Sequence, residues 1–299
     1  MYSDGRRVGR RAPADFISWR KDTPSAFSNS MAFARTPAML VVACLGALAQ
    51  STAQTITAQT PATPMQVDSI SMLQADLMNA AGPATILMKP GRYDVSEELL
   101  IERDVTIQAA IPPSTDGGGV ELNGRGINRV LKVVNGHAKL IGIRITGGHA
   151  TDQGAGIWAQ NSDVRLTECS VDNNHVIVDQ GMADGGGIYA VGGSLHLSYT
   201  RVWNNTAETV GGGIRVVATE TASQEVPVTF DHVHIGHNRA RSDVGGAALS
   251  GVDLRMSFVN VSHNTARDSV GGMTIDGKVA IEHLTVQDHC PEGCAPTQK

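Results

Sequence analysis

Val202-Trp-Asn-Asn205-Thr-Ala207 is a stretch that recurs along this chain, as Ile235-Gly-His-Asn238-Arg-Ala240 and as Val261-Ser-His-Asn264-Thr-Ala266. A glycine pair follows each asparagine after about seven residues, at Gly212-Gly213, Gly245-Gly246 and Gly271-Gly272. A looser copy contains Val171 and Asn174 and ends at Gly186-Gly187. Self-similarity with a period of roughly 20 to 50 residues is the signature of stacked structural repeats. The repeat therefore predicts the architecture before any single residue is considered.

When the copies are aligned on their asparagines, apolar residues fall into columns spaced by two positions. Such spacing puts side chains on one face of a β-strand, so each copy is predicted to hold two short strands joined by a bend. The inward residues of these strands are Val164, Leu166, Cys169, Val171, Leu195, Leu197, Thr200, Val202, Val228, Phe230, Val233, Ile235, Leu254, Met256, Val259 and Val261. A third strand follows each glycine pair, with inward residues Ile157, Ala159, Ile188, Ala190, Ile214, Val216, Ala247, Leu249, Met273 and Ile275.

Three short strands and three turns in each copy describe one rung of a single-stranded right-handed parallel β-helix, an all-β solenoid. The asparagine of each copy is expected at a turn, in a left-handed conformation, with its amide bonded to the adjacent coil. The glycines are expected at another turn, where a side chain would block a sharp reversal. The predicted structural turn residues are Asn174, Asn205, Asn238, Asn264, Gly187, Gly213, Gly246 and Gly272.

The repeats resemble the paired F-x-x-N and G-G-A-[ILV] motifs of polymorphic outer-membrane proteins, and Gly245-Gly-Ala-Ala-Leu249 is the nearest match. Upstream, Ile86-Leu-Met-Lys-Pro-Gly-Arg-Tyr-Asp94 and Leu100-Ile-Glu-Arg-Asp-Val-Thr-Ile107 resemble the opening coils of pectin-lyase-like β-helices. The resemblance covers roughly residues 69–289 and implies the fold, but it is not specific for an activity. Enzymes of that superfamily place clustered aspartates on one outward sheet, whereas Asp172, Asp184, Asp231 and Asp243 do not align here.

The N-terminal part of the chain carries a targeting pattern. A basic start at Met31-Ala-Phe-Ala-Arg35 precedes an apolar run over 39–49, and Ser51-Thr-Ala53 supplies a small-x-small cleavage site. This pattern predicts a signal peptide over 31–53, and a secreted or cell-surface protein. Residues 1–30 are interpreted as a non-native or disordered extension, and 54–68 as a linker. A minority interpretation is a lipid anchor at Cys44, because Val41-Val-Ala-Cys44 resembles a lipoprotein box.

The net charge, the apolar run and the cysteines limit the classes of function and of site that the sequence supports. The net charge of -5 argues against nucleic-acid binding, which needs a basic face. No integral membrane span is expected in the mature chain, because the apolar run is too short to cross a bilayer. Residues 290–299 are predicted to form a C-terminal cap, with a disulfide between Cys290 and Cys294. No cofactor or metal site is predicted, because the His232-x-His234 pair has no third ligand fixed by spacing.

Two outward columns are candidates for ligand binding. Trp158, Tyr189 and Arg215 occupy the outward position of the third strand in successive rungs, where planar groups could stack into a platform for sugars. Arg165, His196 and Arg255 share another outward column, which could contact an acidic glycan or simply be a solvated face. Arg201 and His234 are expected on the neighbouring face across the bend. The inserted loops over 175–184 and 217–225 are the expected specificity elements.

The favoured functional interpretation is a binding, adhesion or structural module without catalytic activity, with an extracellular polysaccharide or a cell-surface glycan as the expected partner. The alternative is a polysaccharide lyase or glycoside hydrolase on the same fold. That alternative requires carboxylates that converge on one face, and the aligned columns contain few. A fragment of a larger repeat protein is a third interpretation.

Overall fold

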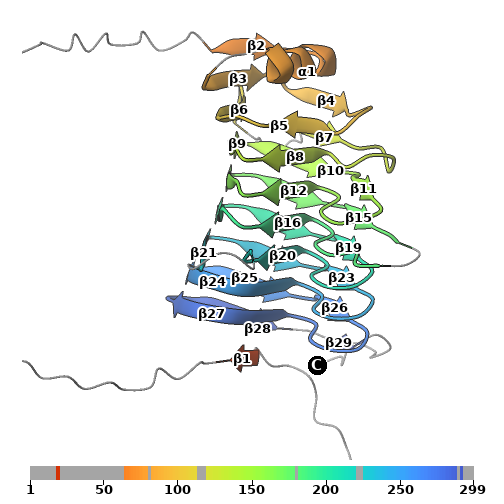
Figure 1. Cartoon of the computed structure of the whole chain (residues 1–299), viewed down its shortest axis with the longest axis vertical. Coiled ribbons are helices and arrows are strands. Elements are labelled where there is room, and N and C mark those ends of the chain that lie inside the picture. The colour runs from red at the N-terminus through yellow and green to blue at the C-terminus, as the bar shows by residue number, and fades with distance from the viewer. Residues whose placement is uncertain are drawn as a thin grey trace, which may run out of the picture. The chain divides into compact units, whose positions relative to one another are not determined.

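The computed structural model of the chain describes residues 18–20, 64–79, 82–112, 119–178, 181–219, 225–287 and 290–291. Two compact units are distinguished, 1–21 with 63–299 and 22–62, and the second lies outside the described residues. The first unit is a parallel β-solenoid in which every strand pairing is parallel (Figure 1). This confirms the predicted all-β class and the stacking of the repeats.

Each rung contributes to four ladders of strands. Sheet 1 consists of the strands that follow the glycine-rich turns, together with their counterparts in the first rungs. Its strands are β5 (Leu99–Ile101), β8 (Leu131–Val134), β12 (Ile157–Gln160), β16 (Ile188–Val191), β20 (Ile214–Val217) and the first parts of β24 (Ala247–Ser257) and β27 (Met273–Ile281). Sheet 2 consists of β2 (Met65–Val67), β3 (Ala84–Met88), β6 (Val105–Ala109), β9 (His137–Ile141), β13 (Asp163–Thr167), β17 (Ser194–Ser198), β21 (Val226–Asp231) and the second parts of β24 and β27. Because β24 pairs with both β20 and β21, sheets 1 and 2 join at that rung.

Sheet 3 comes after the bend and consists of β4 (Gly91–Asp94), β7 (Val120–Asn123), β10 (Ile143–Thr146), β14 (Ser170–Asp172), β18 (Arg201–Trp203), β22 (His234–Gly236), β25 (Val259–Ser262) and β28 (Leu284–Gln287). Sheet 4, which the repeat pattern did not predict, consists of the short strands β11 (His149–Ala150), β15 (His175–Val176), β19 (Thr206–Ala207), β23 (Arg239–Ala240), β26 (Thr265–Ala266) and β29 (Cys290–Pro291). These short strands lie at the right-hand edge of Figure 1.

The aliphatic columns predicted from the sequence form the core. Their members from Val164 to Val261, and those of the third strand from Ile157 to Ile275, are buried. The columns end at the last rung, where Val279, Leu284 and Val286 are half-buried and Ile281 is 41 % exposed. The core is thus one continuous stack that is closed along its sides and more open at its C-terminal rung.

A single α-helix among the described residues, α1 (Ile70–Asn79), lies over the N-terminal rungs (Figure 1). Ser69 begins it, because its hydroxyl accepts a hydrogen bond from the Met72 amide at 3.3 Å. Leu73 is fully buried, and Ile70 and Leu77 pack against the core one turn away on either side. The helix therefore covers the apolar end of the stack, a segment for which the repeat predicted only strands.

Two short strands fall in segments for which the composition predicted no regular structure. β2 lies within 54–68, pairs with β3 and buries Val67, so the solenoid begins before residue 69. β1 (Ser18–Arg20) lies within 1–30 and pairs in parallel with Thr274–Asp276 of β27. The predicted signal peptide over 31–53, the predicted lipid anchor at Cys44 and the predicted disulfide between Cys290 and Cys294 lie outside the residues whose side chains are described.

The repeated asparagines form a buried ladder along the corner between sheets 3 and 4. The Nδ2 of Asn174, Asn205 and Asn238 each donates to the Oδ1 of the asparagine one rung further on, at 3.0 Å. The same oxygens also accept a backbone amide hydrogen bond from the preceding rung. The predicted bonding between coils is confirmed, but the predicted left-handed conformation of these asparagines is wrong.

The left-handed conformation belongs to the residue before each ladder asparagine, namely Asn173, Asn204, His237 and His263. The chain turns at that residue, so the ladder asparagine can point inward while its neighbour points to solvent. The glycine pairs pack against the ladder from the other side. A Cβ on Gly187, Gly213 or Gly246 would lie within 3.1 Å of the amide group of Asn205, Asn238 or Asn264 respectively. Close approach between rungs, rather than a positive φ, therefore requires these glycines.

Candidate functional site

A second corner, at the bend between sheets 2 and 3, carries an exposed column of rings. Glu168, Tyr199, His232 and Phe258 succeed one another there in left-handed conformation. The ring centroids of Tyr199 and His232 are 4.5 Å apart, those of His232 and Phe258 4.7 Å, and those of Phe258 and His283 4.5 Å. Each interior ring is covered on both faces by its neighbours, so among the described rings only those at the two ends of the column have a face without another ring against it. Tyr199 is the N-terminal end.

A groove of about 490 Å³ lies beside that free face of Tyr199. Its polar lining comes from successive rungs and consists of Glu121, Arg144, Glu168, Ser170 and Arg201, with Gly142 and Cys169 between them. Within the described part of the chain, neither Glu168 nor Arg201 has an ion-pair partner, and the Arg201 guanidinium lies 5.1 Å from the ring centroid of Trp203. An aromatic face, a cation and a carboxylate therefore meet in one depression.

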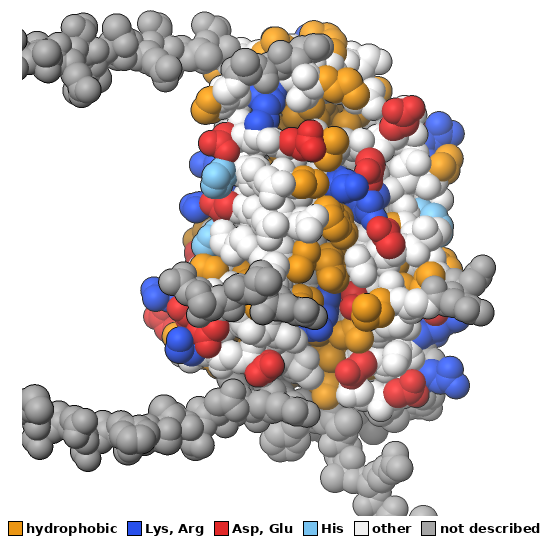
Figure 2. Space-filling model, in the orientation of Figure 1, with side chains coloured by type: hydrophobic (Ala, Val, Ile, Leu, Met, Phe, Trp, Pro, Cys, Tyr) orange, Lys and Arg blue, Asp and Glu red, His pale blue; other side chains and the backbone are white. Residues whose placement is uncertain are grey.

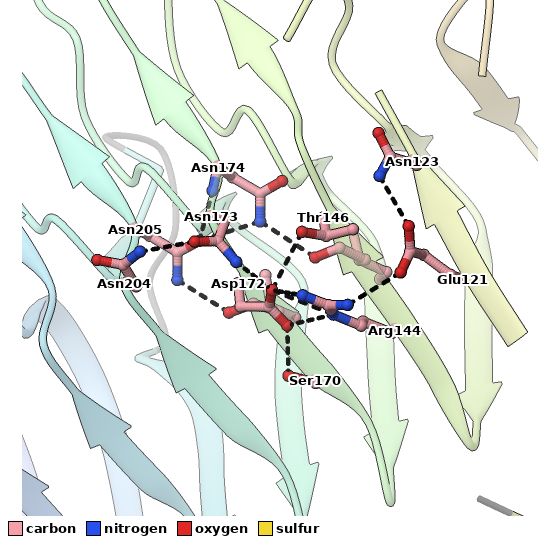
Figure 3. Close-up of polar contacts among 12 residues, drawn as sticks. Glu121, Asn123, Arg144, Thr146, Ser170, Asp172, Asn173, Asn174, Asn204 and Asn205 are labelled. Carbon is pink, nitrogen blue, oxygen red and sulfur yellow. Dashed lines mark hydrogen bonds and ion pairs between the residues drawn. The ribbon is translucent and has the colours of Figure 1, made fainter. Parts of the chain in front are cut away.

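The N-terminal side of the groove is an ion-pair network centred on Arg144 (Figure 3). The guanidinium donates to Asp172 at 2.7 Å and to Glu121 at 2.9 Å. Burial alone would raise the pKa of Asp172, but hydrogen bonds from Arg144 and Ser170 outweigh it and lower that pKa. Asp172 is therefore held as a carboxylate and is a poor general acid. Carboxylates do converge here, which the aligned columns failed to predict.

The C-terminal half of sheet 3 carries a second ring cluster. The Trp203 indole lies over Gly236 of the next rung, where a Cβ would come within 2.9 Å of the ring. The indole meets His234 edge-on at 5.0 Å between centroids and tilts against His237 at 4.1 Å. The ring of His237 in turn stacks on His263 at 4.7 Å. We call His232, His234, His237, His263 and His283 the histidine ribbon, because they come from three successive rungs of one face.

The predicted column of Trp158, Tyr189 and Arg215 lies in register on sheet 1, and all three side chains are half-buried. Hydrophobic and basic side chains form a stripe over the strands of this sheet in Figure 2. The Lys132 ammonium lies 5.1 Å from the Trp158 ring centroid, and Arg215 hydrogen-bonds Ser250. The Trp158 face is thus in contact with a cation from the preceding rung. Its role in sugar binding stays a prediction.

The predicted column of Arg165, His196 and Arg255 lies in register on sheet 2, where Thr229 separates His196 from Arg255. Asp163 pairs with Arg165 at 2.8 Å and also lies 3.7 Å from His196, whose pKa is lowered by burial. Burial would raise the pKa of Asp163, yet its hydrogen bonds from Arg165 and Ser194 lower it. This arrangement favours the solvated-face interpretation of the column. The neighbouring pair Arg201 and His234 lies in register on sheet 3.

The inserted segments 175–184 and 217–225 are described only in part, with 179–180 and 220–224 outside the described residues. Within the described ranges, no three His, Cys, Asp or Glu side chains gather closely enough to hold a metal ion. No helix in the same ranges is long and apolar enough to cross a membrane. Cys169 is a buried free thiol, and burial raises its pKa to about 11, so it stays protonated and unreactive at neutral pH.

The histidine ribbon predicts that acid destabilises the fold. Burial lowers the pKa of His234, and the nearby Arg201 and His237 lower that pKa further. The pKa of His237 is lowered by burial and by the neighbouring His263. In the unfolded chain these rings bind protons at a higher pH, with a pKa of about 6.5. The stability they contribute is therefore present above that pH and is lost as the pH falls through the lower, folded pKa values.

We expect the melting temperature to fall between about pH 7 and pH 5, and to fall less in the double variant His234→Asn/His237→Asn. Ser262→Ala is the matched control, because it removes the 3.0 Å hydrogen bond to His234 but keeps both titrating rings. Differential scanning calorimetry across the pH range measures the slope. An unchanged slope in the double variant would contradict the assignment.

No protein-family model, curated protein or solved structure matches this chain.

Proposed function

We propose that the chain is a non-catalytic glycan-binding module, secreted or displayed at the cell surface, that takes a sugar in the groove beside Tyr199. The proposal rests on one depression in which the outer face of Tyr199 meets the Arg201 guanidinium and the Glu168 carboxylate, neither of which has an ion-pair partner among the described residues. Sugars present apolar C–H faces that pack on aromatic rings, and hydroxyls that bond to charged groups. Both kinds of contact are available in this groove.

The handedness of the solenoid, its superfamily and its secretion are further parts of this proposal. Winding is right-handed, because parallel strands joined by crossover connections adopt that hand in about 98 % of cases. The Pro90-Gly91-x-Tyr93 turn and the asparagine–glycine repeats support membership of the pectin-lyase-like class, with repeats akin to those of polymorphic outer-membrane proteins. The signal-peptide pattern over 31–53 supports secretion.

Tyr199→Ala tests the groove. We expect it to weaken binding of neutral oligosaccharides on a glycan array by about tenfold or more, because the stacking face is lost. Tyr199→Phe keeps the ring and is expected to retain binding. Phe258→Ala is the matched control, since it removes a ring of the same exposed column two rungs away from the groove. Equal losses in Tyr199→Ala and Phe258→Ala would show that the column supports the fold and does not bind sugar.

The second candidate function is cleavage of a polysaccharide, favoured by the convergence of Glu121, which lines the groove, and Asp172 on the Arg144 guanidinium. The tight pairing of both carboxylates with Arg144 argues against it, because a general acid or base needs a free lone pair or an exchangeable proton. Incubation with polygalacturonate or alginate, with and without Ca²⁺, separates the two functions. Release of unsaturated or reducing ends that disappears in Asp172→Asn would establish the enzyme.

A further inference from the structure

The groove beside Tyr199, which we call the Tyr199 groove, holds a carboxylate without a protein partner. Glu168 lies one rung before Tyr199, because Thr167 and Ser198, the residues that precede them, are paired in register. Glu168 and Tyr199 are both exposed and both left-handed, with φ of 54° and 48°. Within the described ranges, the Glu168 carboxylate accepts no hydrogen bond and forms no ion pair. Its charge is therefore available to a ligand.

The corner column is open on the N-terminal side of Glu168. Gly142 occupies the same position one rung earlier, and Gly119 occupies it one rung before that, so neither rung places a side chain there. A ligand group in the groove can reach the Glu168 carboxylate from this side. Glu168 and Tyr199 are separated by the rung spacing of about 4.8 Å, so one cation can pair with the carboxylate and contact the ring.

The other charged groups that line the groove have contacts of their own. Arg144 pairs with two carboxylates, one of which, Glu121, also lines the groove. The Arg201 guanidinium lies 5.1 Å from the ring centroid of Trp203, on the same strand. Glu168 is therefore the lining charge that is neither paired nor held against a ring among the described residues. The group that the groove lacks is a cation beside Glu168.

We propose that the Tyr199 groove selects sugars that carry a protonated amine, as the residues of a deacetylated amino-sugar chain do. This inference rests on the proposed glycan-binding function and names the class of glycan. The ammonium pairs with the Glu168 carboxylate, and the apolar face of the sugar packs on the Tyr199 ring. The net charge of -5 favours the approach of a cationic chain.

A lysine side chain of a protein offers the same ammonium, but an extended peptide fits the groove less well. Such peptides bind by adding a strand to a free sheet edge. The groove instead lies across β7, β10, β14 and β18, which pair with one another in sheet 3. Its lining comes from four successive rungs, a length of about 14 Å at about 4.8 Å per rung. This trough suits a short sugar chain.

Isothermal titration calorimetry of the full chain tests the inference. Glucosamine oligomers are compared with N-acetylglucosamine oligomers of the same length at about pH 6, where an amine of this kind carries a proton. We expect about tenfold tighter binding of the amine form, with a difference that shrinks as salt is raised. Equal affinity, or tighter binding of the acetylated form, would overturn the inference and leave the proposed function standing. Binding of neither form would contradict both.

Two variants with the same change of charge assign the preference to one residue. Glu168→Gln keeps the size of the side chain and removes its charge, so it should bind the two oligomers with nearly equal affinity. Glu102→Gln is the matched control, because Glu102 is exposed and does not line the groove, and it should keep the preference. The melting temperature shows that each variant is folded. A preference that survives in Glu168→Gln, or binding of trilysine without binding of the glucosamine oligomers, would contradict the assignment.

Discussion

Asn205→Ala is expected to lower the free energy of unfolding by about 4 kcal/mol, because buried hydrogen-bonding groups left without partners cost about 1–3 kcal/mol each. The side chain is fully buried, and its Nδ2 donates to the Val171 carbonyl at 2.9 Å and to Asn238 at 3.0 Å. Its Oδ1 accepts from the backbone amide of Asn174 at 3.0 Å. Alanine leaves the Asn174 amide and the Val171 carbonyl without these partners and interrupts the ladder between two rungs.

Urea unfolding followed by circular dichroism measures this loss. Asn204→Gly is the matched control: the adjacent Asn204 is exposed, has a φ of 51° and makes one side-chain bond to Asn173. Glycine accepts that backbone conformation, so the control should lose less than about 1 kcal/mol. If both variants lose the same free energy, the ladder is not a principal source of stability.

Gly246→Ala is the second substitution with a large expected effect, a loss of about 3 kcal/mol, which is the upper end for overpacking a filled core. A Cβ at this position would lie 2.3 Å from the Gly272 carbonyl oxygen and 3.0 Å from Nδ2 of Asn264. The nearer atom belongs to the backbone of the next rung, so it cannot rotate away. Relief requires the two rungs to separate, and separation breaks the hydrogen bonds from the Gly246 amide to Gly271 and Gly272.

Gly119→Ala is the control for this substitution, because a Cβ there meets no atom within 4 Å and no positive φ is present. Its unfolding free energy should lie within about 0.5 kcal/mol of the parent value. Thermal unfolding of the three proteins provides the comparison. A Gly246→Ala protein as stable as the parent would mean that neighbouring rungs can slide apart at low cost.

Most of the core could be predicted from the sequence, because residues two apart on a strand share a face and the asparagines supply a common origin. The alternation assigned Leu166, Phe230 and Met256 to the interior, and all three are buried. The rule that residues two apart share a face fails at the corners between sheets. Tyr199, His232 and His237 adopt left-handed conformations, which reverse the direction of the side chain relative to the strands on either side. Strand faces alone therefore predict the outward direction of His234 but not the ring column or the stacking of His237 on His263.

The Arg144 network was missed for a different reason. Glu121 and Asp172 stand at different positions of their rungs, so no column contains both. The Arg144 side chain is long enough to contact both carboxylates across neighbouring rungs. Aligning residues by their position in the repeat gives no information about how far a side chain extends. Helix α1 also interrupts the repeat. Only the spacing of Ile70, Leu73 and Leu77 indicates it, since these residues lie on one helical face.

The asparagine ladder gives the stack a direction. From Asn174 to Asn205, Asn238 and Asn264, each amide of the ladder donates one N–H to the asparagine oxygen of the next rung, while its second N–H donates to a backbone carbonyl of the preceding rung. The side-chain dipoles therefore add head to tail along the axis, and each bond polarises the next. Gly148, which occupies the asparagine position one rung earlier, presents its own amide N–H to the Asn174 oxygen. A rung that precedes the ladder must supply a hydrogen-bond donor at this position, and a rung that follows must supply an acceptor. The hydrogen-bonding groups of this one column therefore restrict the order in which rungs can stack.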